Sequence, residues 1–284
     1  MNLKYYDIEL TSDINRNRKD PTYQNSKTWP NYKEDLKKYK DYIITDTPKV
    51  LLRVYDGEFW FLLGKKVGNV GKRHISIKID ENIISKFYQN SLKCDKFLSH
   101  LTVLPKGSMH KLYKSVYKDK KIDYPMEFNY ALVLTKWIFK QYKNQIGLMA
   151  GSEKIKVIKE LMKYQSYRDY LGIDKFSDYI SVPERYSCDN VEQLESEIKD
   201  KLKSSKSKVF LFGIGISKLY LAHKFKEFHP ATYIDIGACM SGLAGFLSKT
   251  RPYANNWINY RIKNYDYSNI DKMDMGSNEH ITYL

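Results

Sequence analysis

The chain of 284 residues is long enough for one large domain or two small ones with a packed core. Its 42% hydrophobic and 29% charged residues exclude disordered and collagen-like classes. The net charge of +15 comes mostly from Lys spread along the whole sequence, which favours a solvated surface. A peripheral contact with an anionic membrane stays open, and no DNA partner is expected.

The first residues of the chain indicate the compartment. Residues 1–20 are polar and lack the apolar middle of a secretory signal. The longest apolar run, 209–216, is far shorter than the roughly 18 residues that cross a bilayer. Three widely separated cysteines, Cys94, Cys188 and Cys239, argue against a disulfide framework. We therefore expect a cytoplasmic protein without a signal peptide or a transmembrane segment.

The first half of the chain has mixed patterns. Residues 1–30 are polar and interrupted by prolines, which predicts an irregular arm. A helix is expected over 31–42, and a buried strand over 50–55 that ends at Asp56-Gly57-Glu58. Amphipathic spacing predicts further helices, over 80–93, 108–118 and 127–142.

From Gln145 onward, strand and helix patterns alternate with short loops. The predicted strands are 146–150, 179–182, 209–212 and 233–236, and the predicted helices are 152–164, 190–203 and 216–226. This order indicates right-handed βαβ units and a doubly wound, mostly parallel α/β sheet of Rossmann-like type with helical additions. We divide the chain into an N-terminal arm and helix (1–45), an α/β domain (46–250) and a C-terminal arm or lid (251–284).

Asp56, Gly57 and Glu58 follow directly after the first predicted strand. Two carboxylates separated by one glycine can direct their oxygens to one point, and Mg²⁺ and Mn²⁺ prefer oxygen ligands. The pattern is compatible with a metal site that also takes a diphosphate. An ordinary polar turn is the alternative.

Gly213, Gly215 and Ser217 lie where a predicted strand passes into a helix, a position at which backbone N–H groups can bind phosphate. The dinucleotide-binding fingerprint fails, because Lys218 stands where its last glycine is required. Close packing of a tight turn is the alternative explanation for the two glycines.

Asp235-Ile236-Gly237 is similar to the first nucleotide-site motif of adenosylmethionine-dependent methyltransferases. Cys239 and Ser241 stand where further glycines are expected, and too few residues follow for the rest of that fold. A methyltransferase is therefore an alternative interpretation. The histidines have no metal-ligand spacing, so each is expected on the surface or in the core.

Three segments together resemble the GT-D class of nucleotide-sugar-dependent glycosyltransferases. Residues 51–59 resemble its strand and D-x-E signature, and 209–221 and 231–237 resemble its two successive C-terminal elements. The resemblance implies a Rossmann-like domain that binds a UDP-sugar, with Mn²⁺ or Mg²⁺ at Asp56 and Glu58. Two departures are Val54-Tyr55 before the motif and Ala238-Cys239 after 231–237, where the class has a histidine-containing stretch.

The chemistry that this resemblance implies is transfer of a sugar to a hydroxyl group of a glycan acceptor, with inversion. Glu58 acts through the metal on the leaving diphosphate, and Asp235 is the candidate base for the acceptor proton. Asp235 could equally cap the turn that follows it. Arg53, Arg251 and Arg261 are candidates for diphosphate contacts.

The C-terminal segment adds a possible donor lid. Arg251 and Tyr253 combine a guanidinium with an aromatic ring beside a proline, which suits binding of a nucleotide sugar. Packing of these aromatic residues on the core is the alternative. A basic module that binds nucleic acid or an anionic surface without catalysis remains a further hypothesis.

Overall fold

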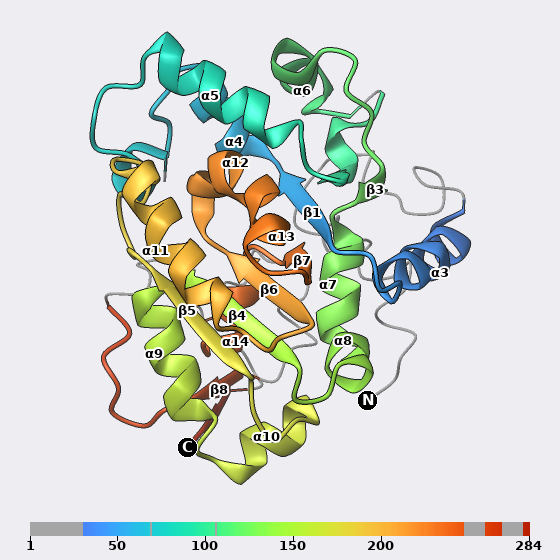
Figure 1. Cartoon of the computed structure of the whole chain (residues 1–284), viewed down its shortest axis with the longest axis vertical. Helices are drawn as coiled ribbons and strands as arrows, with labels where there is room; N and C mark the ends of the chain where they lie inside the picture. The colour runs from blue at the N-terminus through green and yellow to red at the C-terminus, as the bar shows by residue number, and fades with distance from the viewer. Residues whose placement is uncertain (1–30, 69, 106, 247–258, 269–280) are drawn as a thin grey trace.

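A parallel sheet of seven strands forms the centre of the computed structural model, which describes residues 31–68, 70–105, 107–246, 259–268 and 281–284 (Figure 1). The strand order is β3-β2-β1-β7-β6-β4-β5, and every pairing is parallel. The strands are β1 (Lys49–Val54), β2 (Lys96–Ser99), β3 (Tyr124–Pro125), β4 (Ile146–Gly151), β5 (Asp178–Val182), β6 (Val209–Gly213) and β7 (Thr232–Asp235). The predicted doubly wound α/β class is confirmed.

Helices cover both faces of this sheet, with one hydrophobic cluster under each layer. Successive side chains of a strand point to opposite faces, so Leu51 joins one cluster while Val50 and Leu52 join the other. The first layer consists of α3 (Tyr32–Ile43), α7 (Glu127–Leu134), α8 (Trp137–Gln141), α9 (Ser152–Leu161), α10 (Gln165–Leu171) and α14 (Cys239–Leu243). The second consists of α4 (Asp56–Leu62), α5 (Glu81–Ser91), α6 (His110–Tyr117), α11 (Val191–Lys203), α12 (Lys218–Leu221) and α13 (Phe225–Phe228).

The order in which the chain adds strands to the sheet reverses between β1 and β7. From β1 the chain moves outward to β2 and β3, then crosses to β4 and β5 at the far edge and returns through β6 to β7. In open parallel sheets, ligands bind at the carboxyl ends of the strands where the strand order reverses. We therefore expect a ligand site at the carboxyl ends of β1 and β7.

Most predicted elements are present with small shifts at their ends. Two predicted helices are interrupted. Residues 127–142 form α7 and α8, separated at Lys136, whose φ is +60°. The segment 216–226 is built from η5 (Gly215–Ser217), α12, η6 (Ala222–Lys224) and α13. The sequence patterns did not predict β2, β3, α4 or α10.

The last described residues form a small separate sheet of β8 (Asn259–Arg261) and β9 (Ile281–Tyr283). The Arg261 guanidinium is buried, and its Nε donates to the Gly245 carbonyl at 2.9 Å. The diphosphate contact expected of Arg261 remains a prediction. Arg251 and Tyr253, and with them most of the predicted lid, lie outside the described residues.

Two further expectations concern location and boundaries. No helix in the described ranges is long and apolar enough to cross a bilayer. Tyr39 and Ile43 of α3 are fully buried in the first hydrophobic cluster, so this helix packs into the α/β core. The boundaries at 45 and 250 and the cytoplasmic location remain predictions.

Candidate functional site at the carboxyl ends of β1 and β7

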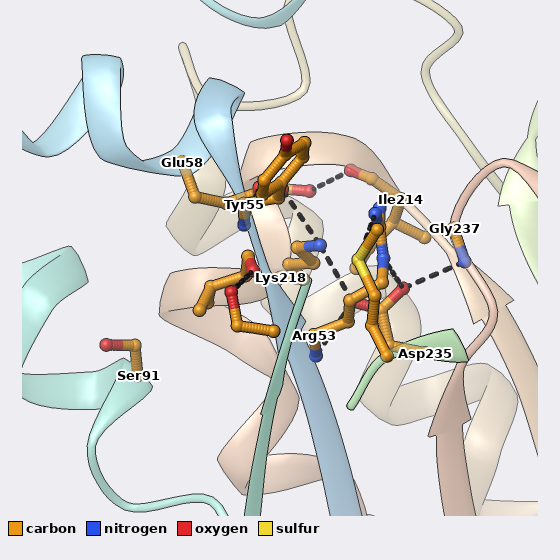
Figure 2. Close-up of polar contacts among 12 residues, drawn as sticks. Arg53, Tyr55, Glu58, Ser91, Ile214, Lys218, Asp235 and Gly237 are labelled. Carbon is orange, nitrogen blue, oxygen red and sulfur yellow. Dashed lines mark hydrogen bonds and ion pairs between the residues drawn. The ribbon is translucent and has the colours of Figure 1, made fainter. Parts of the chain in front are cut away.

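A buried lysine joins two carboxylates at the reversal point of the sheet. The Lys218 ammonium nitrogen lies 2.8 Å from Glu58 Oε1 and 2.7 Å from Asp235 Oδ2 (Figure 2). Lys218 is 2% exposed, Glu58 6% and Asp235 0%. Charged side chains are this deeply buried only when they are paired. The three residues come from α12, α4 and β7, so the contact exists only in the folded chain.

Asp235 accepts hydrogen bonds on both carboxylate oxygens. Besides Lys218, the backbone N–H of Arg53 donates to Oδ2 at 3.2 Å, and the backbone N–H of Gly237 donates to Oδ1 at 3.0 Å. The Asn129 side-chain amide donates to the Asp235 backbone carbonyl at 2.7 Å. These contacts fix Asp235 as an anchor between β7 and its neighbours. A base needs an oxygen directed toward an acceptor, so this geometry supports the capping alternative.

Arg53 extends beneath the loop that follows β7. Its Nε lies 3.8 Å from Asp235 Oδ1, and its Nη1 is 3.7 Å from the Met126 sulfur. Gly237 has a φ of +47°, and a Cβ placed there would lie 2.2 Å from Arg53 Nη2. Only glycine leaves room for the guanidinium, which is held between the ends of β1 and β7.

The D-x-E residues begin a helix rather than forming a free turn. Glu58 is the third residue of α4, and its Oε2 accepts the backbone N–H of Tyr55 at 2.9 Å, one half of a capping box. Burial alone would raise the pKa of Glu58, but the charges of Lys218 and Arg53 hold it below the ordinary value. Asp56, by contrast, is exposed. The two carboxylates of the motif therefore have different environments.

The fit of a divalent cation to this motif depends on Glu58. Lys218 Nζ contacts one of its oxygens and Tyr55 N–H the other. Within the described residues no group of three or more His, Cys, Asp or Glu side chains could hold a metal ion. As arranged, Asp56 and Glu58 do not fit a shared metal site.

The residues of the predicted phosphate-binding turn, Gly213, Gly215 and Ser217, contact neighbouring groups of the protein. A Cβ on Gly213 would lie 2.9 Å from the Gly237 carbonyl oxygen, so this glycine permits close approach of two loops. Gly215 has a φ of +64° and faces His74, whose ring a Cβ would meet at 2.5 Å. The Ser217 hydroxyl donates to the Ile214 carbonyl at 2.8 Å and is therefore directed into the turn.

His74 ends the π-helix η3 (Val70–His74) and lies close to the central cluster. Burial lowers its pKa to about 4, and the charges of Arg73, Lys218 and Lys154 add to that shift while Glu58 opposes it. The imidazole is therefore neutral near pH 7. The charges of Glu58, Lys218, Arg73 and Lys154 therefore all act on His74.

A second group of charges lies at the ends of β4 and β5. Arg73 Nη2 is 2.9 Å from Glu184 Oε1, and Lys154 Nζ is 2.5 Å from the same oxygen. A Cβ on Gly151 would lie 1.9 Å from Glu184 Oε2, so the glycine at the end of β4 makes room for this carboxylate. Arg73 and Lys154 therefore contact the same carboxylate oxygen.

Glu127 is a buried carboxylate at the start of α7. Neither of its oxygens has a hydrogen-bond partner among the described side chains and backbone groups, although His100 Nε2 lies 3.2 Å from Oε1. Burial raises the pKa of Glu127 to about 7; neighbouring backbone N–H groups and the charge of Arg53 oppose the shift only in part. Carboxylates with such values are suited to proton transfer at neutral pH.

A chain of polar contacts connects Glu127 to Tyr55. The Thr102 backbone N–H donates to His100 Nδ1 at 3.1 Å, so the hydrogen of the neutral ring is on Nε2, which lies 3.2 Å from Glu127 Oε1. Thr102 Oγ1 lies 2.9 Å from His100 Nδ1 and 3.1 Å from the Tyr55 hydroxyl. Tyr55 is half-buried and packs against His100, with ring centroids 4.7 Å apart and ring planes tilted by 31°. The chain ends beside Asp56.

The structure brings Arg53, Glu58 and Asp235 together, and adds residues that the sequence did not single out. Lys218 had one signal, its place at the failed glycine position of the fingerprint. No such signal marked Glu127, His100, Arg73 or Lys154, because no sequence spacing relates residues that lie on separate elements of the fold. His100 directly follows β2, and Glu127 begins the helix that comes one residue after β3; the patterns predicted neither strand.

Comparison with known proteins gives distant structural neighbours. The sequence matches no protein-family model and no curated protein. The chain is similar to a glycosyltransferase (DUF1792) from Streptococcus sanguinis, with 12% identity, a TM-score of 0.45, and coverage of 87% of this chain and 97% of that one. It is also similar to a structure of the highly conserved domain of unknown function 1792 with a distinct glycosyltransferase fold, at 13% identity, a TM-score of 0.48, and coverage of 88% and 92%.

These neighbours are glycosyltransferase-fold chains of the class that residues 51–59, 209–221 and 231–237 resemble. The methyltransferase alternative loses support from the topology. Its motif follows β7, and no later strand joins the large sheet within the described part of the chain.

Proposed function

We propose that this protein is a glycosyltransferase that moves a sugar from a UDP-sugar to a hydroxyl group of a glycan acceptor, with inversion. One observation carries the proposal. Each of the three segments that resemble the GT-D class contributes one member of the buried contact: Glu58 from 51–59, Lys218 from 209–221 and Asp235 from 231–237. The contact lies at the carboxyl ends of β1 and β7, where parallel sheets bind their ligands.

Cationic side chains at this edge suit a diphosphate leaving group. When the bond between the sugar and the diphosphate breaks, negative charge develops on the departing oxygen, and fixed cations stabilise it. We assign this contact to Arg73 and Lys154, the two cationic side chains that meet at Glu184 beside the carboxyl ends of β4 and β5. Arg53, held by Asp235 and Gly237, has a positioning role between the strands.

The acceptor proton requires a route away from the reacting centre. As the new bond from the acceptor oxygen to the sugar carbon forms, the hydroxyl loses its hydrogen as a proton. We assign its transfer to the chain of Tyr55, Thr102 and His100, in which each group accepts one hydrogen and passes another on. The His100 Nε2 hydrogen then moves to Glu127, which ends protonated. Glu127 takes the role of base first given to Asp235.

A ligand panel tests the function. Melting temperatures are measured with several UDP-sugars, with S-adenosylmethionine and with a short DNA duplex, because a ligand that binds only the folded chain raises its melting temperature. A UDP-sugar at about 100 times its Kd should add about 2.7 kcal/mol to the free energy of unfolding. Release of UDP in the presence of an acceptor then measures turnover. A shift with S-adenosylmethionine or DNA and none with any UDP-sugar would overturn the proposal.

A further inference from the structure

Lys218 lies where a cation bridging two carboxylates would lie. Its ammonium nitrogen is within 2.8 Å of Glu58 Oε1 and 2.7 Å of Asp235 Oδ2, and its side chain is 2% exposed. Glu58 and Asp235 are otherwise engaged by backbone N–H groups of Tyr55, Arg53 and Gly237. The two carboxylates therefore already have a shared counter-ion that belongs to the protein.

A divalent ion at the same place would meet that ammonium group. An ion bound to Glu58 Oε1 would lie about 2.1 Å from the oxygen, and so within a few ångströms of Nζ. An ammonium group and a divalent ion at this separation repel each other, and the repulsion is twice that between two unit charges at the same distance. Lys218 is itself 2% exposed, so its ammonium group would have to leave a buried position to make room for the ion.

The other carboxylate of the motif does not replace Glu58. Asp56 is exposed at the first residue of α4, whereas Glu58 is directed into the core toward Lys218. A single exposed carboxylate is a weak ligand set for Mn²⁺, which takes several oxygen ligands.

We propose that Lys218 takes the position of the divalent cation that the D-x-E motif predicts, and that Glu58 and Asp235 bind this ammonium group instead of a metal. The positive charge between Glu58 and Asp235 is thus supplied by a side chain of the protein and not by a bound ion. The inference extends the proposed function to its cofactor requirement. It implies that sugar transfer does not require a metal ion bound by Glu58, whichever sugar is transferred.

Direct Mn²⁺ binding tests this proposal without a sugar donor. Free Mn²⁺ is measured by electron paramagnetic resonance during titration of the wild-type chain, Lys218→Ala and Lys218→Met, each with and without UDP. Both variants remove the positive charge, but only Ala leaves space between the two carboxylates for an ion. Lys218→Ala should bind one Mn²⁺ at least tenfold more tightly than the wild type and Lys218→Met.

The melting temperature provides a second readout if Lys218→Ala folds poorly. Mn²⁺ should then raise the melting temperature of Lys218→Ala and leave that of the wild type unchanged, because only the variant has a vacant cation position. One Mn²⁺ bound by the wild type, with or without UDP, and lost in Glu58→Gln would overturn the proposal. So would equal Mn²⁺ affinities of Lys218→Ala and Lys218→Met. Neither measurement requires sugar transfer, so this test can fail or succeed independently of the proposed function.

Discussion

Gly237 and Arg53 are in such close contact that no side chain fits between them: a Cβ on Gly237 would lie 2.2 Å from Arg53 Nη2. The glycine also has a φ of +47°. The loop after β7 therefore closes over the guanidinium that extends from β1, and the two central strands are joined at their carboxyl ends.

Gly237→Ala should lower the free energy of unfolding by about 3 kcal/mol, because the new Cβ both strains the backbone and displaces Arg53. Gly172→Ala is a matched control. Gly172 also has a positive φ, +77°, but nothing lies within 4 Å of the point that a methyl group would occupy there, so only backbone strain of about 1 kcal/mol is expected. Urea denaturation of both variants measures the difference. Equal losses would show that Arg53 moves aside without cost.

Glu58→Gln and Asp56→Asn should have very different effects on stability, although the residues are two positions apart. Removing the Glu58 charge leaves Lys218 buried with one partner fewer and should cost about 3 kcal/mol. Asp56 is exposed, so its substitution should change the free energy of unfolding by less than about 0.5 kcal/mol. Chemical denaturation at pH 7 compares them. A stable Glu58→Gln variant would contradict the buried contact.

Glu127 should make stability fall as the pH rises. Its pKa is about 7 in the folded chain and near 4.5 when unfolded, so between these values only the folded state holds the proton. The free energy of unfolding should therefore decrease from pH 4.5 to 7 by about 3 kcal/mol and then level off. Glu127→Gln lacks this contribution. The free energy of unfolding of the wild type minus that of Glu127→Gln should be smaller at pH 8 than at pH 5.

His74 contributes the opposite pH dependence and provides an internal check. Its pKa is lowered to about 4, so stability is lost as the pH falls from 6.5 toward 4. This contribution is common to the wild type and Glu127→Gln and cancels in their difference. A difference between the two proteins that is flat from pH 5 to 8 would contradict the raised pKa of Glu127.

The rate of sugar transfer should rise with pH to a plateau above about 7, since Glu127 accepts a proton only when ionised. Glu127→Gln should lose most of kcat with little change in the KM for the donor, because Glu127 lies on the proton path and not at the diphosphate. Initial rates over about pH 5.5–9, a range that includes the Glu127 pKa of about 7, give both kcat and KM. An unchanged kcat in Glu127→Gln would exclude Glu127 as the proton acceptor.

Lys154→Met should raise the KM for the UDP-sugar about tenfold, the loss expected for one charge-assisted hydrogen bond to phosphate. Lys156→Met is the matched control, because Lys156 lies on the same helix α9 but is exposed. It changes the net charge equally and should leave the KM unchanged. Equal increases in the two variants would indicate a general charge effect.

The sequence by itself determined the second half of the fold. From Gln145 onward, short apolar runs alternate with amphipathic segments, and this order permits only parallel strands joined by helices. The strand at 50–55 was evident from its continuous apolar run. By contrast, β3 has two residues, too few for any period, and the chain from β2 to β3 contains mixed polar segments. Their pairing depends on neighbours far away in the sequence.

Only the tertiary structure decided what the charged residues do. The D-x-E pattern appears in the sequence as two equivalent carboxylates, yet helix α4 directs Glu58 inward and leaves Asp56 exposed. Lys218 is evident in the sequence only as a missing glycine. Its partners become known once β1 and β7 lie side by side, since only then do Glu58 and Asp235 face one ammonium group. Strand order, and not local spacing, brings such charges together.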